Sequence, residues 1–264
     1  MAFDINNFVI DRVVRGVALS QKDDSVLFSI NQMQNVSLNC ASESTDAVDA
    51  LGTPIATFQN GKEAEFSAQN SLFDLGLLAA QMGTEKESAT EESMIVVPVF
   101  HTADVKSGVF KLDKAPKGEI AEIYTLRGDG TTGEKYAVVA SEPTAKEFAY
   151  NAETMEITVG GDVADGTQFF VVYETETAKA VQVSNSAVEF PKAGKFVMEI
   201  LGCDVCDPET LIYAYLIFPN AKLDSNVDIT LTTDGKHPFS MKAQQAYCDK
   251  KKLLFNIVVP ETEE

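Results

Sequence analysis

A single short stretch of this sequence, residues 71–82, has the pattern of a buried helix, and strand patterns fill the rest. Ser71 is a suitable N-cap with Asp74 three residues later, and Gly83 is a typical helix-ending residue. Apolar side chains cover most of its circumference: Leu72, Phe73, Leu75, Leu77, Leu78, Ala79, Ala80 and Met82. A helix that is apolar on most sides is buried. The sequence therefore predicts one helix packed against β-sheets.

The segment before this helix predicts a β-hairpin. Residues 55–58 and 64–68 have extended patterns, and Asn60-Gly61 lies between them. Asn-Gly is the strongest short hairpin signal, because both central residues of a type I′ turn need positive φ. The second strand alternates apolar and polar residues, so we expect one of its faces to be buried.

The N-terminal part predicts an arm over residues 1–10 and strands over 12–20, 25–30 and 36–40. Residues 41–53 are rich in Ser, Thr, Asp and Gly and show no periodicity, which indicates a long loop. Such long loops in compact domains are usually functional or ordered by a partner.

The C-terminal part predicts two hairpins and a last strand. One pair is residues 194–201 with 211–218, and the other is residues 226–232 with 238–246 across Asp234-Gly235. Residues 252–259 form the expected last strand.

The middle of the chain has a different character. Short strand patterns separated by Gly- and Asp-rich turns follow one another over residues 109–112, 120–126, 136–140, 155–159 and 168–173. This regular spacing is typical of a small β-sandwich. We expect residues 101–180 to form an accessory immunoglobulin-like β module.

The charge of the chain disfavours nucleic-acid recognition. Its formal net charge is −19, and its densest basic run is only Lys250-Lys251-Lys252. An acidic surface without a basic patch repels phosphates. The longest apolar runs, residues 211–218 and 253–259, are too short for a membrane span. We expect no signal peptide, no membrane contact and synthesis in the cytoplasm.

The pair Cys203 and Cys206 has the spacing of half a zinc site. His237 or Cys248 could add ligands if the C-terminal strands lie beside it. The favoured interpretation is two reduced thiols in a turn between strands, since a redox CxxC normally opens a helix.

No motif in the sequence points to catalysis. GxSxG, P-loop, HExxH and GxGxxG patterns are absent. The only histidines are His101 and His237, and the neighbours of His237 indicate a hairpin turn. The sequence therefore predicts a protein that is not an enzyme, with no catalytic, cofactor-binding or metal-binding residues.

Three segments resemble the tail tube (major tail) proteins of long-tailed bacteriophages: residues 52–58, 61–66 and 70–75. In that family a hairpin leads into one helix beside a β-barrel, and residues 228–246 and 252–260 are similar to the closing strands. The resemblance implies a mainly β fold: a tail-tube-like β-barrel or sandwich with one packed α-helix at about 71–82. This discontinuous domain would span residues 1–100 and 181–264. The module at 101–180 departs from the minimal family pattern.

The resemblance also implies a function. The chain would be a virion structural protein that self-assembles into stacked, hexameric rings. These rings would form the phage tail tube, contact other tail proteins and pass DNA without sequence-specific binding. The arm at 1–10 and the loop at 41–53 are candidates for contacts between rings. The alternative is a capsid decoration or other head structural protein with an immunoglobulin-like domain. A sugar-binding module is disfavoured because the chain lacks Trp.

Overall fold

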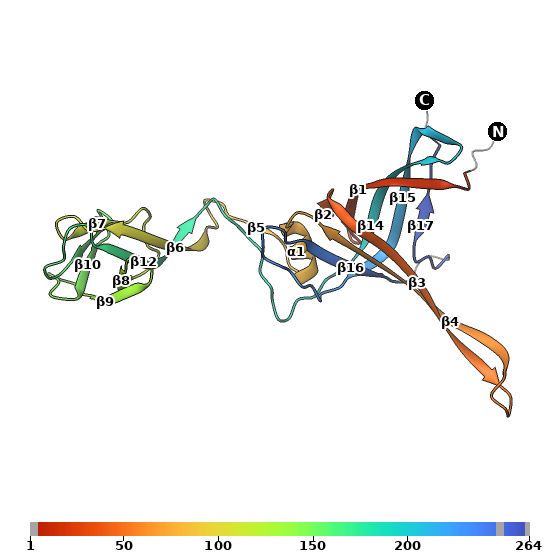
Figure 1. Ribbon diagram of the computed structural model, residues 1–264, viewed down its shortest axis with the longest axis horizontal. Coiled ribbons are helices and arrows are strands. Elements are labelled where there is room, and N and C mark those ends of the chain that lie inside the picture. The colour runs from red at the N-terminus through yellow and green to blue at the C-terminus, as the bar shows by residue number, and fades with distance from the viewer. Residues whose placement is uncertain (1–4, 247–250, 262–264) are drawn as a thin grey trace. The chain divides into compact units, whose positions relative to one another are not determined.

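The chain folds into two compact units, each with its own hydrophobic core. The computed structural model describes residues 5–246 and 251–261. The first unit comprises residues 1–86 and 183–264, and the second comprises residues 87–182. Both units are built from β-strands, and the described residues contain one α-helix (Figure 1).

The first unit is a curled antiparallel sheet with the strand order β2-β1-β14-β15-β16-β4-β3, and β17 pairs with another part of β15. Its elements are β1 (Phe8–Ser20), β2 (Val26–Ile30), β3 (Met33–Val48), β4 (Pro54–Asn70), α1 (Leu75–Met82), β14 (Ala193–Asp204), β15 (Asp207–Leu223), β16 (His237–Ala243) and β17 (Asn256–Val258).

One face of this sheet carries the core of the unit. Inward-facing residues alternate along the central strands, so that Phe196 of β14 lies opposite Phe218 of β15. The aromatic centre has neighbouring ring centroids 5.4–6.4 Å apart and consists of Phe28, Phe66, Phe196, Phe218 and Phe239. Rings at these separations add stabilisation beyond the area that they bury.

Helix α1 begins at Leu75, later than the predicted start after Ser71. Asp74 is the N-cap, because its backbone is extended and its carboxylate accepts from the Leu77 N–H at 2.7 Å. The predicted C-terminal residue is confirmed, since Gly83 ends the helix in the left-handed conformation. Leu77, Ala79 and Gln81 are buried. The helix packs mainly against β2.

The predicted hairpin at Asn60-Gly61 is wrong, and so is the predicted loop at 41–53. Residues 54–70 form one continuous strand, β4, which pairs with β3 over nearly its full length. The turn lies at residues 49–53, where Asp49 accepts from two backbone N–H groups and Gly52 has φ +84°. The long ladder satisfies more backbone groups than two short strands would, and it therefore overrides the local Asn-Gly signal.

The antiparallel pairing of residues 194–201 with 211–218 is confirmed, and the structure places Phe196 opposite Phe218. The second C-terminal hairpin is wrong, because residues 226–232 form no strand and β16 pairs with β4 and β15. This placement buries Phe239 and Met241 in the core. The last strand is shorter than predicted and covers Asn256–Val258.

The N-terminal strands at 12–20 and 25–30 are confirmed as β1 and β2. The predicted arm at 1–10 is wrong in part, because β1 already begins at Phe8 and pairs with β14 there. Residues 1–4 of that arm lie outside the described residues.

The second unit has a seven-stranded sheet with the order β6-β12-β8-β9-β10-β11-β7 and a two-stranded sheet, β13-β5. Its strands are β5 (Glu87–Ser88), β6 (Ile95–Asp104), β7 (Val109–Lys111), β8 (Glu122–Leu126), β9 (Thr132–Val138), β10 (Glu147–Asn151), β11 (Glu156–Val159), β12 (Gln168–Thr177) and β13 (Val181–Gln182).

The core of the second unit is centred on Phe148, Phe169 and Val171. All five strands expected in the middle of the chain are present, and β10 is an additional one. Residues 87–100, expected in the tail-tube-like domain, are part of this unit. Its immunoglobulin-like character remains a prediction.

Candidate assembly surfaces

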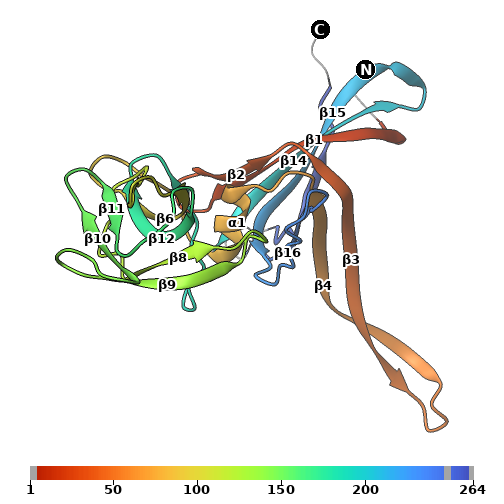
Figure 2. The same cartoon turned by 60° about the vertical axis from the view of Figure 1, so that its left-hand side comes forward.

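The β3–β4 hairpin extends well beyond the core of the first unit. β3 has 16 residues and β4 has 17, which corresponds to about 50 Å of strand. Near its base, Ala64, Phe66 and Ala68 are buried. All residues from 41 to 63 are exposed, and we call this segment the distal arm. Figure 1 and Figure 2 both show the hairpin continuing past the rest of the sheet.

The distal arm ends in an ordered turn. The backbone N–H groups of Leu51 and Thr53 donate to Asp49 Oδ1 at 2.8 and 2.9 Å. The N–H of Thr53 and then that of Leu51 lower the pKa of the Asp49 carboxyl below its usual value. The turn is thus held by an ionised carboxylate at neutral pH. It presents Leu51 at the apex.

The distal arm exposes large apolar side chains on both strands and at its apex. Leu51 is 91% exposed, Ile55 71% and Phe58 62%. A two-stranded ribbon that is wet on both faces is marginally stable on its own. Clustered exposed apolar residues mark interaction surfaces. The arm therefore has the properties of a segment that is buried by another molecule.

The distal arm is mainly acidic, and Lys62 near its base is its one basic residue. Residues 41–60 contain Glu43, Asp46 and Asp49 and no lysine or arginine. An acidic partner surface would disfavour binding of this arm, because like charges brought together at an interface oppose binding.

A second exposed apolar surface lies at the far end of β1, β14 and β15. Val9, Cys203 and Leu211 are neighbours across the three strands. Val9, Ile10, Leu211 and Tyr213 are all exposed. This surface is called the end surface, and it is a further candidate for contact with another copy.

The two end strands of the main sheet, β2 and β3, do not pair with each other in the described residues. Each therefore has an edge with free backbone donors and acceptors. Val26 and Leu27 of β2 are also exposed. Open edges of this kind are sites of strand addition by other chains.

The predicted position of His237 in a hairpin turn is wrong, because His237 is fully buried against helix α1. Its Nδ1 accepts from the Asp74 N–H at 3.3 Å, so Nε2 carries the proton and donates to Gln81 Oε1 at 2.7 Å. Gln81 in turn donates to the Pro238 carbonyl at 3.1 Å. Phe73 stacks on the imidazole with a centroid distance of 5.2 Å. These contacts tie the helix to β16.

Burial lowers the pKa of His237 below its ordinary value, and the carboxylate of Asp74 opposes this shift. The ring is therefore neutral at physiological pH. Every polar atom of the ring has a partner in the fold, which indicates a structural rather than a catalytic role.

His101, the second histidine, lies in the second unit and is nearly buried. Its Nε2 is 3.0 Å from the Lys111 carbonyl oxygen, and its Nδ1 is 3.3 Å from Asp113 Oδ2. No nucleophile is among these neighbours. The contacts connect β6 with the residues at the end of β7.

Cys203 and Cys206 lie at the turn between β14 and β15. Both are free thiols, with Cys203 half-buried and Cys206 exposed. Within residues 5–246 and 251–261, no group of three His, Cys, Asp or Glu side chains is placed to hold a metal ion. Cys248, named above as a possible ligand, lies outside the described residues.

Sequence reasoning placed the candidate contact segment at residues 41–53 but missed that most of it is strand. A signal was present in Thr45 and Val48, because β-branched residues favour strands. The apolar exposure of Ile55 and Phe58 was also missed. In the described residues no helix has the length and hydrophobicity needed to cross a membrane.

Comparison with known proteins identifies the family. Residues 8–252 match the YomU/Tube protein family, and this range includes all of the second unit and most of both parts of the first. No curated protein matches the chain. Because the match extends over most of the sequence, the chain belongs to the YomU/Tube family of phage tail tube proteins.

Proposed function

We propose that this protein is the structural subunit of a phage tail tube, in which copies form rings and the rings stack into a cylinder. The observation that carries this proposal is the distal arm, since no other part of its own unit, among the residues that the structure describes, covers its apolar side chains. Family membership supports a virion structural role in the tail. Synthesis in the host cytoplasm is a further part of the proposal. The function needs no catalytic residue, cofactor or membrane.

Two kinds of contact are required for a stacked tube. Within a ring, the free edges of β2 and β3 would pair with neighbouring copies, which removes the unpaired backbone groups. Such a head-to-tail contact closes into a ring if its rotation permits. Between rings, the distal arm would reach the next copy along the axis. We propose six subunits per ring.

The charge of the chain suits a conduit for DNA. A ring of six copies would carry 6 × −19 = −114 formal charges. A negatively charged wall repels phosphates, so DNA would pass along it without being held. The remaining partners would be other tail proteins at the two ends of the tube.

Negative-stain microscopy of the purified protein over a range of concentrations tests this function. Rings and cylinders of uniform width are expected to increase with concentration, and sedimentation should show the matching large species. A protein that stays monomeric or trimeric at every concentration, and binds only when phage capsids are added, would instead support a head decoration protein.

A further inference from the structure

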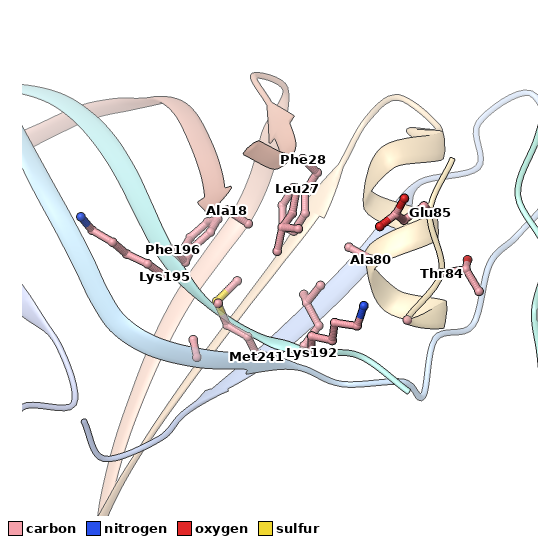
Figure 3. A pocket seen from close by; sticks show the side chains of 14 residues that line it. Ala18, Leu27, Phe28, Ala80, Thr84, Glu85, Lys192, Lys195, Phe196 and Met241 are labelled. Atoms are coloured by element: carbon pink, nitrogen blue, oxygen red, sulfur yellow. The ribbon is translucent and has the colours of Figure 1, made fainter. Parts of the chain in front are cut away.

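The first unit contains an apolar pocket next to its helix. It lies between α1, β2 and the strands β14, β15 and β16. Figure 3 shows Phe28, Phe196 and Met241 converging on it, with Ala80 of the helix facing it. The free volume is about 70 Å³. An apolar cavity of roughly 150 Å³ admits benzene, so this pocket is of a size for one aliphatic side chain.

One lining residue of the pocket makes a tight backbone contact. Gly83, the residue that ends α1, packs so closely on Phe190 that a Cβ there would lie 2.3 Å from the Phe190 backbone. The floor is built from residues of the main core, including Phe28 and Phe196. The pocket is thus formed by well-packed elements and needs no rearrangement to receive a side chain.

The rim of the pocket has the opposite charge to the distal arm. Its lining includes Lys192, Lys195 and Glu85, which gives a formal charge of +1 in a chain of net charge −19. Figure 3 shows the Lys192 side chain extending from the strand side toward α1. The distal arm carries Asp49 in the turn with its exposed Leu51, and Asp46 lies farther along β3, where its Oδ1 accepts from the Thr57 hydroxyl at 2.6 Å. An acidic, apolar apex and a basic, apolar pocket are complementary.

We propose that the apex of the distal arm of one copy inserts Leu51 into this pocket of another copy, with Asp46 facing Lys192. This inference rests on the proposed function and names the receiving surface of the contact between rings. The occupant is a second copy of this chain because the same chain supplies an uncovered leucine and a matching acidic flank. The ordered turn at Asp49 holds Leu51 in place before binding, which reduces the entropic cost of association.

The geometry makes each copy both donor and acceptor. Arm and pocket are different surfaces of the same unit, so the contact is head-to-tail and propagates along an axis. Blocking either surface therefore stops growth at once, but a copy blocked at the arm can still receive, and a copy blocked at the pocket can still insert.

Two variants test this directly. Leu51→Ser removes the inserting side chain from a fully exposed position, and Ala80→Met fills the pocket from the helix side. Leu231→Ser is the matched control for the first, because Leu231 is also 83% exposed but lies outside the arm. Each blocking variant is expected to raise the concentration needed for tube formation by about tenfold or more. The control should assemble like the unaltered protein.

The decisive measurement is a mixture of the two blocking variants, followed by sedimentation velocity and negative-stain microscopy. At the concentration at which the unaltered protein forms cylinders, each variant alone should form rings that do not stack. Mixed in equal amounts, they should form pairs of rings but no cylinder of more than two rings. The only productive contact joins the intact arm of the Ala80→Met ring to the intact pocket of the Leu51→Ser ring. Cylinders formed by Leu51→Ser alone at the concentration at which the unaltered protein first forms them, or a mixture indistinguishable from its components, would overturn the inference.

A charge exchange keeps the test valid if Ala80→Met disturbs the fold. Lys192→Glu should weaken stacking, and Asp46→Lys in the same chain should restore it. No restoration would contradict the proposed facing of these two residues. If the unaltered protein forms no rings or cylinders at any concentration, the proposed function itself fails. If the unaltered protein and the variants all form cylinders equally well, only the contact between Leu51 and the pocket fails.

Discussion

The buried bond between His237 and Gln81 allows a double-mutant prediction. His237→Phe leaves the Gln81 Oε1 and the Asp74 N–H without partners, whereas Gln81→Leu leaves the His237 Nε2–H and the Pro238 carbonyl unpaired. An unpaired buried polar group costs about 1–3 kcal/mol. Each single variant, with two such groups, is therefore expected to lose about 2–6 kcal/mol of the free energy of unfolding of the first unit.

The double variant has a different expectation. With both substitutions, only the Asp74 N–H and the Pro238 carbonyl remain unpaired, so the loss should resemble that of one single variant. The two losses should thus combine to about half of their sum, which is a large coupling between the two side chains.

Urea unfolding followed by hydrogen-exchange mass spectrometry measures this, because peptides from the two units report separately. His101→Phe is the control, since it removes the other nearly buried histidine from the second unit. It should leave the first unit unchanged. Additive losses in the double variant, or single variants as stable as the unaltered protein, would refute the assignment of this network.

Three further predictions concern the arm, pH and Gly83. Replacing residues 43–61 by Asn-Gly joins the paired residues Ser42 and Lys62 by a tight turn. The monomer should keep its free energy of unfolding but form no tubes in electron micrographs. A lower stability of the first unit would contradict this. The pKa of His237 is lowered in the fold. The contribution of the neutral ring to the free energy of unfolding is therefore complete above the unfolded pKa of about 6.5 and is lost as pH falls through the folded pKa. This loss is at most about 1.4 kcal/mol per pH unit. The difference in unfolding free energy between the unaltered protein and His237→Phe should therefore shrink from pH 7.5 toward pH 5, and a constant difference would argue against it. Gly83→Ala should cost about 1–3 kcal/mol because of its φ of +76° and the Phe190 backbone, whereas Gly61→Ala, with open space around it, should change urea stability by less than about 0.5 kcal/mol.

Sequence patterns predicted the parts of this fold that have one buried face. β14 and β15 alternate strongly because the side chains on one face enter the core, and their register follows from that alternation. The helix was predicted from its apolar composition and from Gly83. Its first residue was misplaced because Ser71 and Asp74 are both good N-caps, and only the geometry decides between them.

The sequence-based predictions were wrong where a residue's contact partner is distant in sequence, or where neither face of a strand is buried. His237 has Gly and Pro neighbours, which favour a turn, but its partner Gln81 is 156 residues away. The distal arm lacks apolar alternation since water contacts both faces, so the periodicity that predicts strands is missing there. The same wet faces are what makes the arm a candidate for assembly.

The arm separates folding from assembly in this protein. The cores of both units are formed without any residue between 41 and 63, so changes in the distal arm should act on association and leave each unit folded. The net charge of −19 opposes association of free copies, and an ion pair at an exposed rim contributes at most about 1 kcal/mol. Burial of Leu51 and its apolar neighbours must therefore supply most of the free energy of stacking. Because salt screens repulsion between exposed charges but does not weaken apolar burial, cylinders should become longer as ionic strength rises. Shorter cylinders at high salt would mean that charge pairs, and not Leu51, hold the rings together.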